Sequence, residues 1–289
     1  MNVCVCIPTL NAGNTWMEVV SAVKSQSFCP TRVLVLDSSS TDDTAELATR
    51  NGWQVVTIPR TQFSHGGTRQ KALELAPDAD VLVYLTQDSI LADSNALAQL
   101  IAAFEDPSIG AAYGRQLPRR GAHHIEAHDR LFNYPPVSGI RSLASASEIG
   151  FKAIFFSNSF GAYRRVALEQ VGGFSRDAEF GEDTLVAAHL LQSGWRILYA
   201  AEAQAYHSHA YSRSELFERY YKIGRLHGND PWLQREFGRA SGEGHKFVIS
   251  EIRYLLRHAP WLIPEAIIRT GVKYLGYKQG RKNIAQQPS

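Results

Sequence analysis

The stretch that decides the fold is RVLVLDSSSTDD, residues 32–43. Residues 32–36 form a β-branched, apolar run that predicts a buried strand, and this strand ends at Asp37. The hydroxyl and carboxylate side chains that follow predict the N-terminal cap of a helix, which continues to Arg50 before Gly52 ends it. The stretch therefore predicts a strand, a polar loop and a helix, in that order.

The same order recurs on both sides of this stretch. Strands are expected at residues 3–7, 54–58 and 81–85, and helices at residues 15–25 and 67–75. Further along, the pattern predicts helices at 97–104, 166–171 and 184–193 and strands at 109–113, 154–162 and 197–200. Residues 119–147 look like a polar insertion without a readable pattern. Because strands alternate with helices, we expect an α/β fold with a mostly parallel sheet flanked by helices.

The alternation stops near residues 211–214, and almost everything beyond favours helix. We therefore expect an α/β domain at residues 1–212, with halves at 1–115 and 116–212. A helical C-terminal extension should occupy residues 213–289.

Composition excludes several classes of protein. The 289 residues are 44% hydrophobic and 20% charged, which is typical of a globular chain, and the net charge of +2 is too small to indicate a nucleic-acid partner. Cys4, Cys6 and Cys29 form no disulfide or metal-binding pattern, so we interpret them as small buried residues in a reducing cytoplasm. We expect neither a signal peptide nor a membrane-spanning segment.

Polar residues follow the predicted strands at the carboxyl edge of the sheet, where ligands of open α/β folds bind. Thr9 and Asp37 lie there, and Asp37 either accepts hydrogen bonds from a base and ribose or caps the next helix. Asp88 follows another strand at the corresponding place. Its carboxylate can bind a hard cation that bridges two phosphates.

The segment HGGTR, residues 65–69, follows the third predicted strand and leads into the helix predicted at residues 67–75. Its paired glycines allow a phosphate to approach the backbone near the positive end of that helix, and Arg69 adds a cation. A purely structural turn is the alternative. The chain lacks the P-loop and the dinucleotide-binding GxGxxG pattern, which disfavours kinases and dehydrogenases.

Further candidate groups lie in the second half. Glu182 and Asp183 open a predicted helix, where acids either interact with the helix dipole or serve as a base toward an acceptor hydroxyl. His207 and His209 follow a predicted strand and either complete a metal site with Asp88 or have a structural role.

Taken in order, four motifs resemble those of the family-two glycosyltransferases: IPTLN (7–11), LDSSSTDDT (36–44), LTQD (85–88) and GED (181–183). The resemblance covers roughly residues 1–210. HGGTR (65–69), LTQD (85–88) and YHSH (206–209) look like the rhamnosyltransferase branch of that family.

The resemblance implies a GT-A fold, a nucleotide-diphosphate sugar donor, Mg²⁺ or Mn²⁺, and inversion at the anomeric carbon by direct displacement. Residues 1–115 would bind the donor and residues 116–212 the acceptor. Asp183 would be the general base, with Glu182 as the alternate, and Asn158 would contact the acceptor or the transferred sugar. The donor would contact Thr9, Asn11, Asp37, Ser39, His65, Arg69 and Gln87.

The metal-binding motif departs from the family pattern. Asp88 matches the second acid of the family's DxD motif, but Thr86 stands in place of the first. His207 or His209 would therefore help Asp88 to hold the metal.

The C-terminal segment combines apolar residues at helical spacing with many Lys and Arg residues. Such a segment can lie in the headgroup layer of an anionic membrane, or it can pack onto the catalytic domain or a second subunit. We expect a cytoplasmic enzyme, and the membrane alternative would place it at the inner face of the cytoplasmic membrane.

The favoured function is transfer of L-rhamnose from dTDP-L-rhamnose to a lipid-linked saccharide during synthesis of a bacterial surface polysaccharide such as the O-antigen of lipopolysaccharide. The alternative enzyme is the same fold using a UDP-hexose or UDP-hexosamine. A nucleotidyltransferase would need a Gly-rich loop with Lys or Arg after the first strand, which PTLN (8–11) does not supply. A non-catalytic sugar-binding protein is the remaining alternative.

Overall fold

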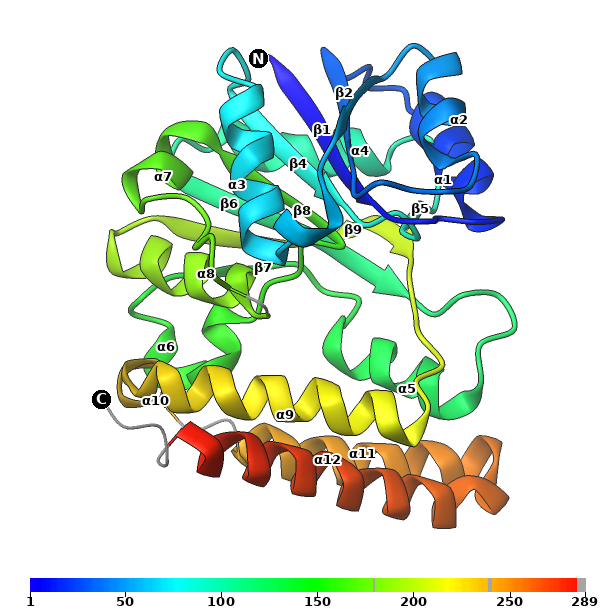
Figure 1. Cartoon of the computed structure of the whole chain (residues 1–289). Coiled ribbons are helices and arrows are strands. Elements are labelled where there is room, and N and C mark those ends of the chain that lie inside the picture. The colour runs from blue at the N-terminus through cyan, green and yellow to red at the C-terminus, as the bar shows by residue number, and fades with distance from the viewer. Residues whose placement is uncertain (179, 239–240, 285–289) are drawn as a thin grey trace. The chain divides into compact units, whose positions relative to one another are not determined.

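The computed structural model describes residues 1–178, 180–238 and 241–284. The chain forms two compact units (Figure 1). The first unit comprises residues 1–116, 135–143 and 155–207, and the second comprises residues 117–134, 144–154 and 208–289. The second unit thus combines the C-terminal helices with parts of the predicted polar insertion.

The first unit contains a mixed sheet. Its strand order is β3-β2-β1-β4-β8-β6-β9-β5, and β7 pairs with β9. The parallel part consists of β1 (Val3–Thr9), β2 (Arg32–Asp37), β3 (Gln54–Thr57) and β4 (Val81–Leu85). These are the predicted N-terminal strands. The apolar runs of β1, β2 and β4 are nearly continuous because strands in the centre of an α/β sheet are covered by helices on both faces. β3 lies at the edge of the sheet and is only partly buried.

The remaining strands are β5 (Ile90–Leu91), β6 (Ile109–Leu117), β7 (Gly139–Arg141), β8 (Phe160–Arg164) and β9 (Arg196–Tyr206). In the rest of the sheet, β8 pairs antiparallel with β4 and β6, and β9 pairs antiparallel with β5 and β7. The expected strand at 154–162 was wrong at its start, because residues 150–154 form a 3-10 helix and the strand begins at Phe160. β9 continues beyond the predicted end at residue 200 to Tyr206, immediately before His207.

The helices of the first unit are α1 (Thr15–Lys24), α2 (Thr44–Arg50), α3 (His65–Leu75), α4 (Ala96–Ile101), α7 (Arg165–Gln170) and α8 (Glu182–Gln192). Helix α1 buries Trp16, Val19, Val20 and Val23 in the same core as β1.

Cys4 and Cys6 are buried in β1 as expected, but Cys29 is exposed, so the prediction was wrong for that residue. All three thiols are free.

The glycines of residues 65–69 lie inside a helix. Gly66 and Gly67 belong to the first turn of α3, and the Ser64 hydroxyl caps that turn by accepting a hydrogen bond from the Gly67 amide at 2.9 Å. A Cβ atom on Gly66 would lie 1.8 Å from the carbonyl oxygen of Ser175. The helix therefore begins two residues before the predicted start at Gly67, the alternative of a purely structural turn was wrong, and Gly66 permits close packing against a peptide carbonyl.

The second unit is helical. Its helices are α5 (His124–Asn133), α6 (Ala146–Ile149), α9 (Arg213–Asn229), α10 (Pro231–Phe237), α11 (Ser241–His258) and α12 (Ile263–Ile284). Short 3-10 helices occur in the two units at Arg60–Gln62, Ala102–Glu105, Gly150–Ile154 and Pro260–Leu262. A reciprocal pair of hydrogen bonds between Ser212 and Glu215 caps α9, which fixes where that helix begins.

Helices α9 and α12 lie side by side (Figure 1) and approach each other at three glycines. A Cβ atom on Gly224, Gly276 or Gly280 would lie 2.1–2.5 Å from a carbonyl oxygen of the facing helix. The backbones therefore touch where these glycines lie.

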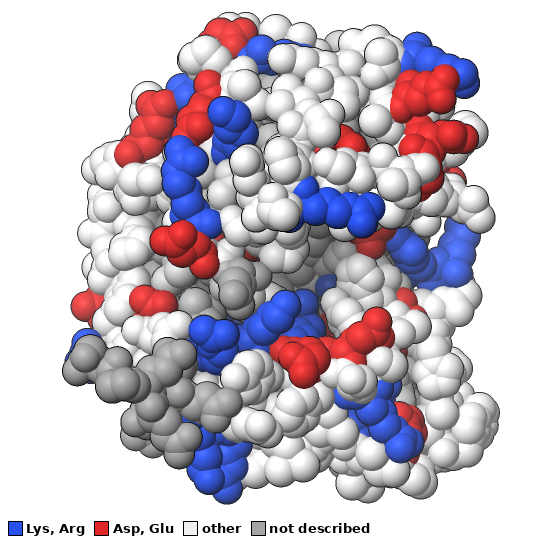
Figure 2. Space-filling view, viewed as in Figure 1, with Lys and Arg blue, Asp and Glu red and all other residues white. Residues whose placement is uncertain are grey.

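Among the described residues, no helix has an apolar stretch long enough to cross a bilayer. On the face shown in Figure 2, basic and acidic side chains are interspersed.

Candidate active site

The first cluster of site residues is built around the start of α8. Arg69, from α3, forms an ion pair with Glu182, and the guanidinium nitrogen lies 2.9 Å from the carboxylate oxygen. Both residues are buried, with 6% and 5% of their surface exposed. The side-chain amide of Asn158 donates a further hydrogen bond to Glu182 at 3.2 Å and accepts one from the Tyr163 hydroxyl at 2.8 Å. Glu182 is therefore neutralised and held by fixed donors.

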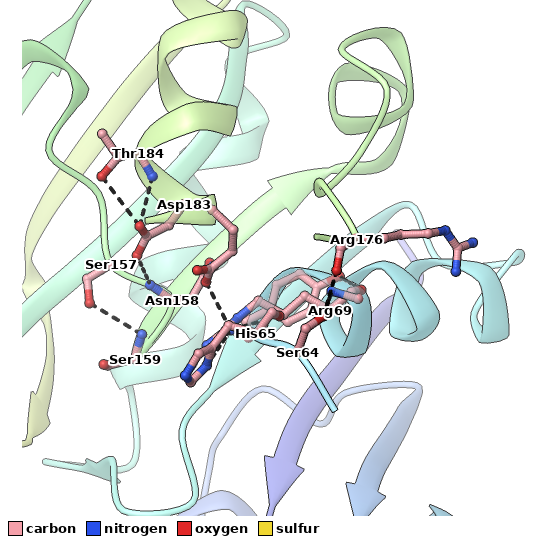
Figure 3. Close-up of polar contacts among 12 residues, drawn as sticks. Ser64, His65, Arg69, Ser157, Asn158, Ser159, Arg176, Asp183 and Thr184 are labelled. Carbon is pink, nitrogen blue, oxygen red and sulfur yellow. Dashed lines mark hydrogen bonds and ion pairs between the residues drawn. The ribbon is translucent and has the colours of Figure 1, made fainter. Parts of the chain in front are cut away.

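Asp183 lies beside this ion pair and is only half-buried. Its carboxylate accepts hydrogen bonds from the amide of Thr184 at 2.8 Å and from the amide of Asn158 at 3.4 Å (Figure 3). Burial, followed by the charge of Glu182, raises the pKa of Asp183 to about 7, although Arg69 and the two amides oppose that rise.

This environment separates the roles of the two neighbouring carboxylates. Glu182 is buried and occupied by Arg69, whereas Asp183 is partly accessible and more basic than an ordinary aspartate. A general base is most effective when its pKa lies near the working pH. A large fraction of it is then ionised, and its proton affinity is still high enough to accept a proton. The pair can therefore supply one structural carboxylate and one general base.

The second cluster contains Asp88, His207 and His209. Asp88 follows β4 and His207 follows β9, and the Asp88 carboxylate lies 3.4 Å from Nε2 of His207. His209 comes two residues later in the chain, and one ligand atom from each of the three residues lies within 4.8 Å of the others. The sequence-predicted metal-binding residues are therefore brought together.

Gln116, which the sequence did not suggest, orients His207. Its side-chain carbonyl lies 2.9 Å from Nδ1 of His207, and its amide nitrogen donates to the Ser157 hydroxyl at 2.7 Å. This arrangement assigns the imidazole proton to Nδ1 and directs Nε2 toward Asp88 as the ligand atom. Gln116 lies near the end of β6 and is buried, so only the folded strand reveals its role.

The donor chemistry fits a divalent metal ion. A carboxylate and two imidazoles form a set that binds first-row divalent metals, and an imidazole whose second nitrogen is held by an amide carbonyl is typical of metal-bound histidine. Imidazole ligands suit Mn²⁺ better than Mg²⁺, which prefers oxygen ligands and water.

The third cluster lies at the ends of β1 and β2, where Thr9 and Asp37 are register partners. Asp37 is buried, and its carboxylate accepts hydrogen bonds from the Thr9 hydroxyl at 2.9 Å and from the Ser40 hydroxyl and amide at 2.5 and 2.8 Å. Asp37 therefore organises the loop that follows β2. The capping alternative predicted from sequence placed this carboxylate on the next helix, but Thr44, the first residue of α2, bonds to Asp42 instead.

The neighbouring loop residues also bond to each other. The Asn11 side chain accepts a hydrogen bond from the Thr41 amide at 2.8 Å, and the side-chain amide of Gln87 exchanges two hydrogen bonds with the backbone of Leu10. Asn11 and Ser39 both adopt positive φ angles, 47° and 60°, which are uncommon for non-glycine residues. These contacts hold the loops after β1, β2 and β4 together.

His65 and Arg69 lie one turn apart on α3, and the Arg69 guanidinium donates to the His65 carbonyl oxygen at 3.1 Å. Arg69 was expected at the donor's ribose or phosphates, and the structure directs its guanidinium to Glu182 and to His65. Asn158 likewise lies against the acidic pair.

Comparisons with known proteins agree with this arrangement. The model of the family described as "Glycosyl transferase family 2" matches residues 4–172. The O-antigen chain rhamnosyltransferase RfbN of Salmonella typhimurium is 45% identical over 97% of this chain and 90% of its own length. The O-antigen chain rhamnosyltransferase WbaN of Salmonella anatum is 44% identical over 95% of this chain and 88% of its own length.

Solved structures share the fold. The mannosyltransferase PcManGT of Pyrobaculum calidifontis, in complex with GDP-Man and Mn²⁺, matches with a TM-score of 0.60 and 19% identity over 98% of this chain and 83% of that one. TarS of S. aureus, residues 1–349, matches with a TM-score of 0.55 and 15% identity over 99% and 92%. The expected GT-A fold is confirmed. The family match and the two close relatives together show that this chain belongs to glycosyl transferase family 2.

Proposed function

We propose that this enzyme transfers L-rhamnose from dTDP-L-rhamnose to a lipid-linked saccharide during O-antigen synthesis. The observation that carries the chemistry is the half-buried Asp183 carboxylate, whose pKa is raised to about 7 beside the neutralised Glu182. The sugar and the pathway are supported by two relatives, both O-antigen chain rhamnosyltransferases, that are 45% and 44% identical over almost the whole chain.

Asp183 accepts the proton of the acceptor hydroxyl as that oxygen attacks the anomeric carbon. The amides of Thr184 and Asn158 hold the carboxylate in one orientation, so the proton-accepting oxygen is aimed before the acceptor arrives. Glu182 does not serve as the base because Arg69 and Asn158 occupy it. Attack on the face opposite the diphosphate inverts the configuration at the anomeric carbon.

The donor lies over the loops after β1, β2 and β4. In this proposal Thr9, Asn11, Asp37, Ser39 and Gln87 shape the pocket for the base and ribose through the loop contacts described above, and His65 and Arg69 border its phosphate side. Asp88, His207 and His209 hold the divalent ion. A bound Mn²⁺ would neutralise the charge that develops on the departing diphosphate.

A peripheral membrane contact through the C-terminal helices fits a lipid-linked acceptor. Trp261, Ile267 and Leu275 have exposed fractions of 72%, 60% and 58%, and Lys and Arg residues lie along the same segment. Exposed aromatic and aliphatic side chains combined with cations favour the interface of an anionic bilayer. Co-sedimentation with phosphatidylglycerol vesicles tests this contact, and binding that Trp261→Ser does not weaken would contradict it.

The activity is tested by supplying the purified chain with a lipid-linked saccharide acceptor, Mn²⁺ and one donor at a time: dTDP-L-rhamnose, UDP-glucose or UDP-N-acetylglucosamine. We expect turnover with dTDP-L-rhamnose and a loss of about 10²–10⁴-fold in Asp183→Asn, which removes the base. Asp177→Asn, an exposed acid a few residues earlier, is the control and should retain full activity. Turnover with a UDP-sugar alone would replace the proposed donor, and full activity of Asp183→Asn would remove the proposed base.

A further inference from the structure

A groove of about 570 Å³ lies within the second unit, between α5 and α11. Its charged lining residues are Lys246, Arg253 and Arg257, and no Asp or Glu is among the described residues that line it. Lys246 pairs with Glu243 at 2.8 Å, whereas neither arginine has an acidic partner among the described residues. The groove therefore presents two uncompensated guanidinium groups.

The two arginines are four residues apart on α11, so their side chains emerge from the same face of the helix about one turn apart. Guanidinium groups bind phosphate oxygens through paired hydrogen bonds. Two of them at this spacing suit a ligand with two adjacent phosphates.

A buried polar group in the same groove points to a ligand independently. His128, from α5, is 3% exposed, and its Nε2 lies 2.9 Å from the Ser250 hydroxyl. Its Nδ1 is buried and has no hydrogen-bond partner, although a buried polar atom normally has one. Burial lowers the pKa of His128 to about 4, so the ring is neutral near pH 7. A neutral ring that accepts the Ser250 proton at Nε2 carries its own proton on Nδ1, and the described residues offer that proton no acceptor.

The rest of the lining is apolar. Leu131 and Ile249 border the groove with exposed fractions of 42% and 50%, and Phe132 lines it as well. Exposed aliphatic groups beside uncompensated cations match an amphiphile, which carries an anionic head and a hydrocarbon chain. Inorganic phosphate would use only the cations, and a planar membrane surface would not need a concave site.

We propose that this groove binds the diphosphate and the first part of the hydrocarbon chain of a lipid-diphosphate-linked acceptor. The inference rests on the proposed function for the identity of the acceptor, because that function requires a saccharide carried on a lipid. Arg253 and Arg257 bind the phosphates, His128 donates to one phosphate oxygen, and Leu131 and Ile249 contact the chain.

Binding is tested first, without any transfer reaction. Isothermal titration of the full-length chain with farnesyl diphosphate probes the whole site, and inorganic diphosphate probes the cations alone. We expect the Kd of farnesyl diphosphate to rise about tenfold or more in R253Q/R257Q, because charge-assisted hydrogen bonds are lost. His128→Phe keeps a ring but removes Nδ1, and it should weaken binding of both probes. Ile249→Ser should weaken binding of farnesyl diphosphate and leave inorganic diphosphate unchanged.

The control variant K222Q/K278Q removes the same charge from exposed lysines of α9 and α12 and should bind farnesyl diphosphate like the wild type. Equal losses in both double variants, or unchanged binding in R253Q/R257Q, would overturn the proposal. If the arginine variant loses only its binding to phosphatidylglycerol vesicles, the site is a membrane contact and the proposal is wrong.

Transfer is measured separately, with a lipid-diphosphate-linked saccharide and with the methyl glycoside of the same saccharide. R253Q/R257Q should raise KM for the lipid-linked acceptor and leave KM for the methyl glycoside unchanged. An equal effect on both acceptors contradicts a lipid-diphosphate site. If the wild type binds farnesyl diphosphate but transfers no sugar to either acceptor, the proposed function fails while the binding site stands.

Discussion

Arg69 and Glu182 form a buried ion pair at 2.9 Å that fixes the residue immediately before the candidate base. Because one helix supplies the cation and another the anion, the start of α8 is tied to α3. The charge of Glu182 also acts on Asp183 and is the second cause, after burial, of that residue's raised pKa. The ion pair therefore has electrostatic as well as structural consequences for the base.

Glu182→Gln should shift the pH dependence of catalysis. The variant keeps hydrogen-bond acceptors for Arg69 and Asn158 but removes the negative charge that raises the pKa of Asp183. That pKa should fall, so the acid limb of the kcat/KM profile should move from near pH 7 to lower pH. The profile of Glu74→Gln, whose carboxylate lies in an exposed pair with Arg176, should match the wild type. If the acid limb of the kcat/KM profile is not shifted in Glu182→Gln, then ionisation of Asp183 does not limit the rate at low pH.

Asp183→Asn should change how stability depends on pH. The pKa of Asp183 is raised to about 7 in the folded chain, above its ordinary value of 3.8, so the folded state binds more protons than the unfolded state between these values. Its contribution to stability is therefore fully present below about pH 4 and is lost as pH rises through 7. Relative to the wild type, the variant should be more stable at pH 8 than at pH 5.

Urea denaturation at both pH values measures this difference, with Asp177→Asn as the exposed control. A variant whose stability relative to the wild type is the same at pH 5 and pH 8 would show that Asp183 titrates normally in the folded chain.

Gln116→Leu should weaken metal binding while the ligands themselves stay in place. The variant removes the carbonyl that faces Nδ1 of His207, and losses of this kind reduce metal affinity by about 10–100-fold. Titration calorimetry with Mn²⁺ measures the effect. Gln99→Leu, an exposed change on α4, serves as the control and should bind Mn²⁺ normally. Wild-type affinity in Gln116→Leu would show that His207 needs no partner at Nδ1 or is not a ligand.

Gly280→Leu should destabilise the second unit. A Cβ atom at this position would lie 2.1 Å from the Tyr221 carbonyl oxygen. That oxygen belongs to the backbone of α9, so it cannot move away as the end of a flexible side chain could. Separating α9 from α12 would expose their shared apolar surface, so a loss of about 1–3 kcal/mol or more in the free energy of unfolding is expected. Gly271→Leu, on the same helix with nothing within 4 Å, is the control. Equal melting temperatures for the two variants would show that α9 and α12 do not depend on this contact.

The sequence predicted the parallel half of the sheet well because three of its four strands, β1, β2 and β4, are apolar on both faces. β1 and β2 are uninterrupted runs that end at polar loops, so their ends and the site at those ends could be located. The last part of β9 was missed. In residues 201–206 the inward positions are Ala201, Ala203 and Ala205, and alanine has low strand propensity, so the alternation was hard to recognise.

The site was predictable in its acids and histidines but not in their partners. Asp88 and His207 could be related because both follow strands. Gln116 carries no local signal, since a buried amide acquires its role only from the strands that surround it. The ion pair of Arg69 with Glu182 joins distant parts of the chain, so sequence reasoning assigned Arg69 to the donor instead.

The hydrogen bonds of Gln116 have one further consequence. They connect His207 to Ser157, whose neighbour Asn158 donates its amide to Asp183. An ion bound at Asp88 and His207 would restrain this chain of contacts up to the base. Metal and acceptor binding would then be cooperative, and by reciprocity a bound acceptor would raise the affinity for the ion by the same factor. Such an enzyme would bind its metal most tightly while an acceptor is present.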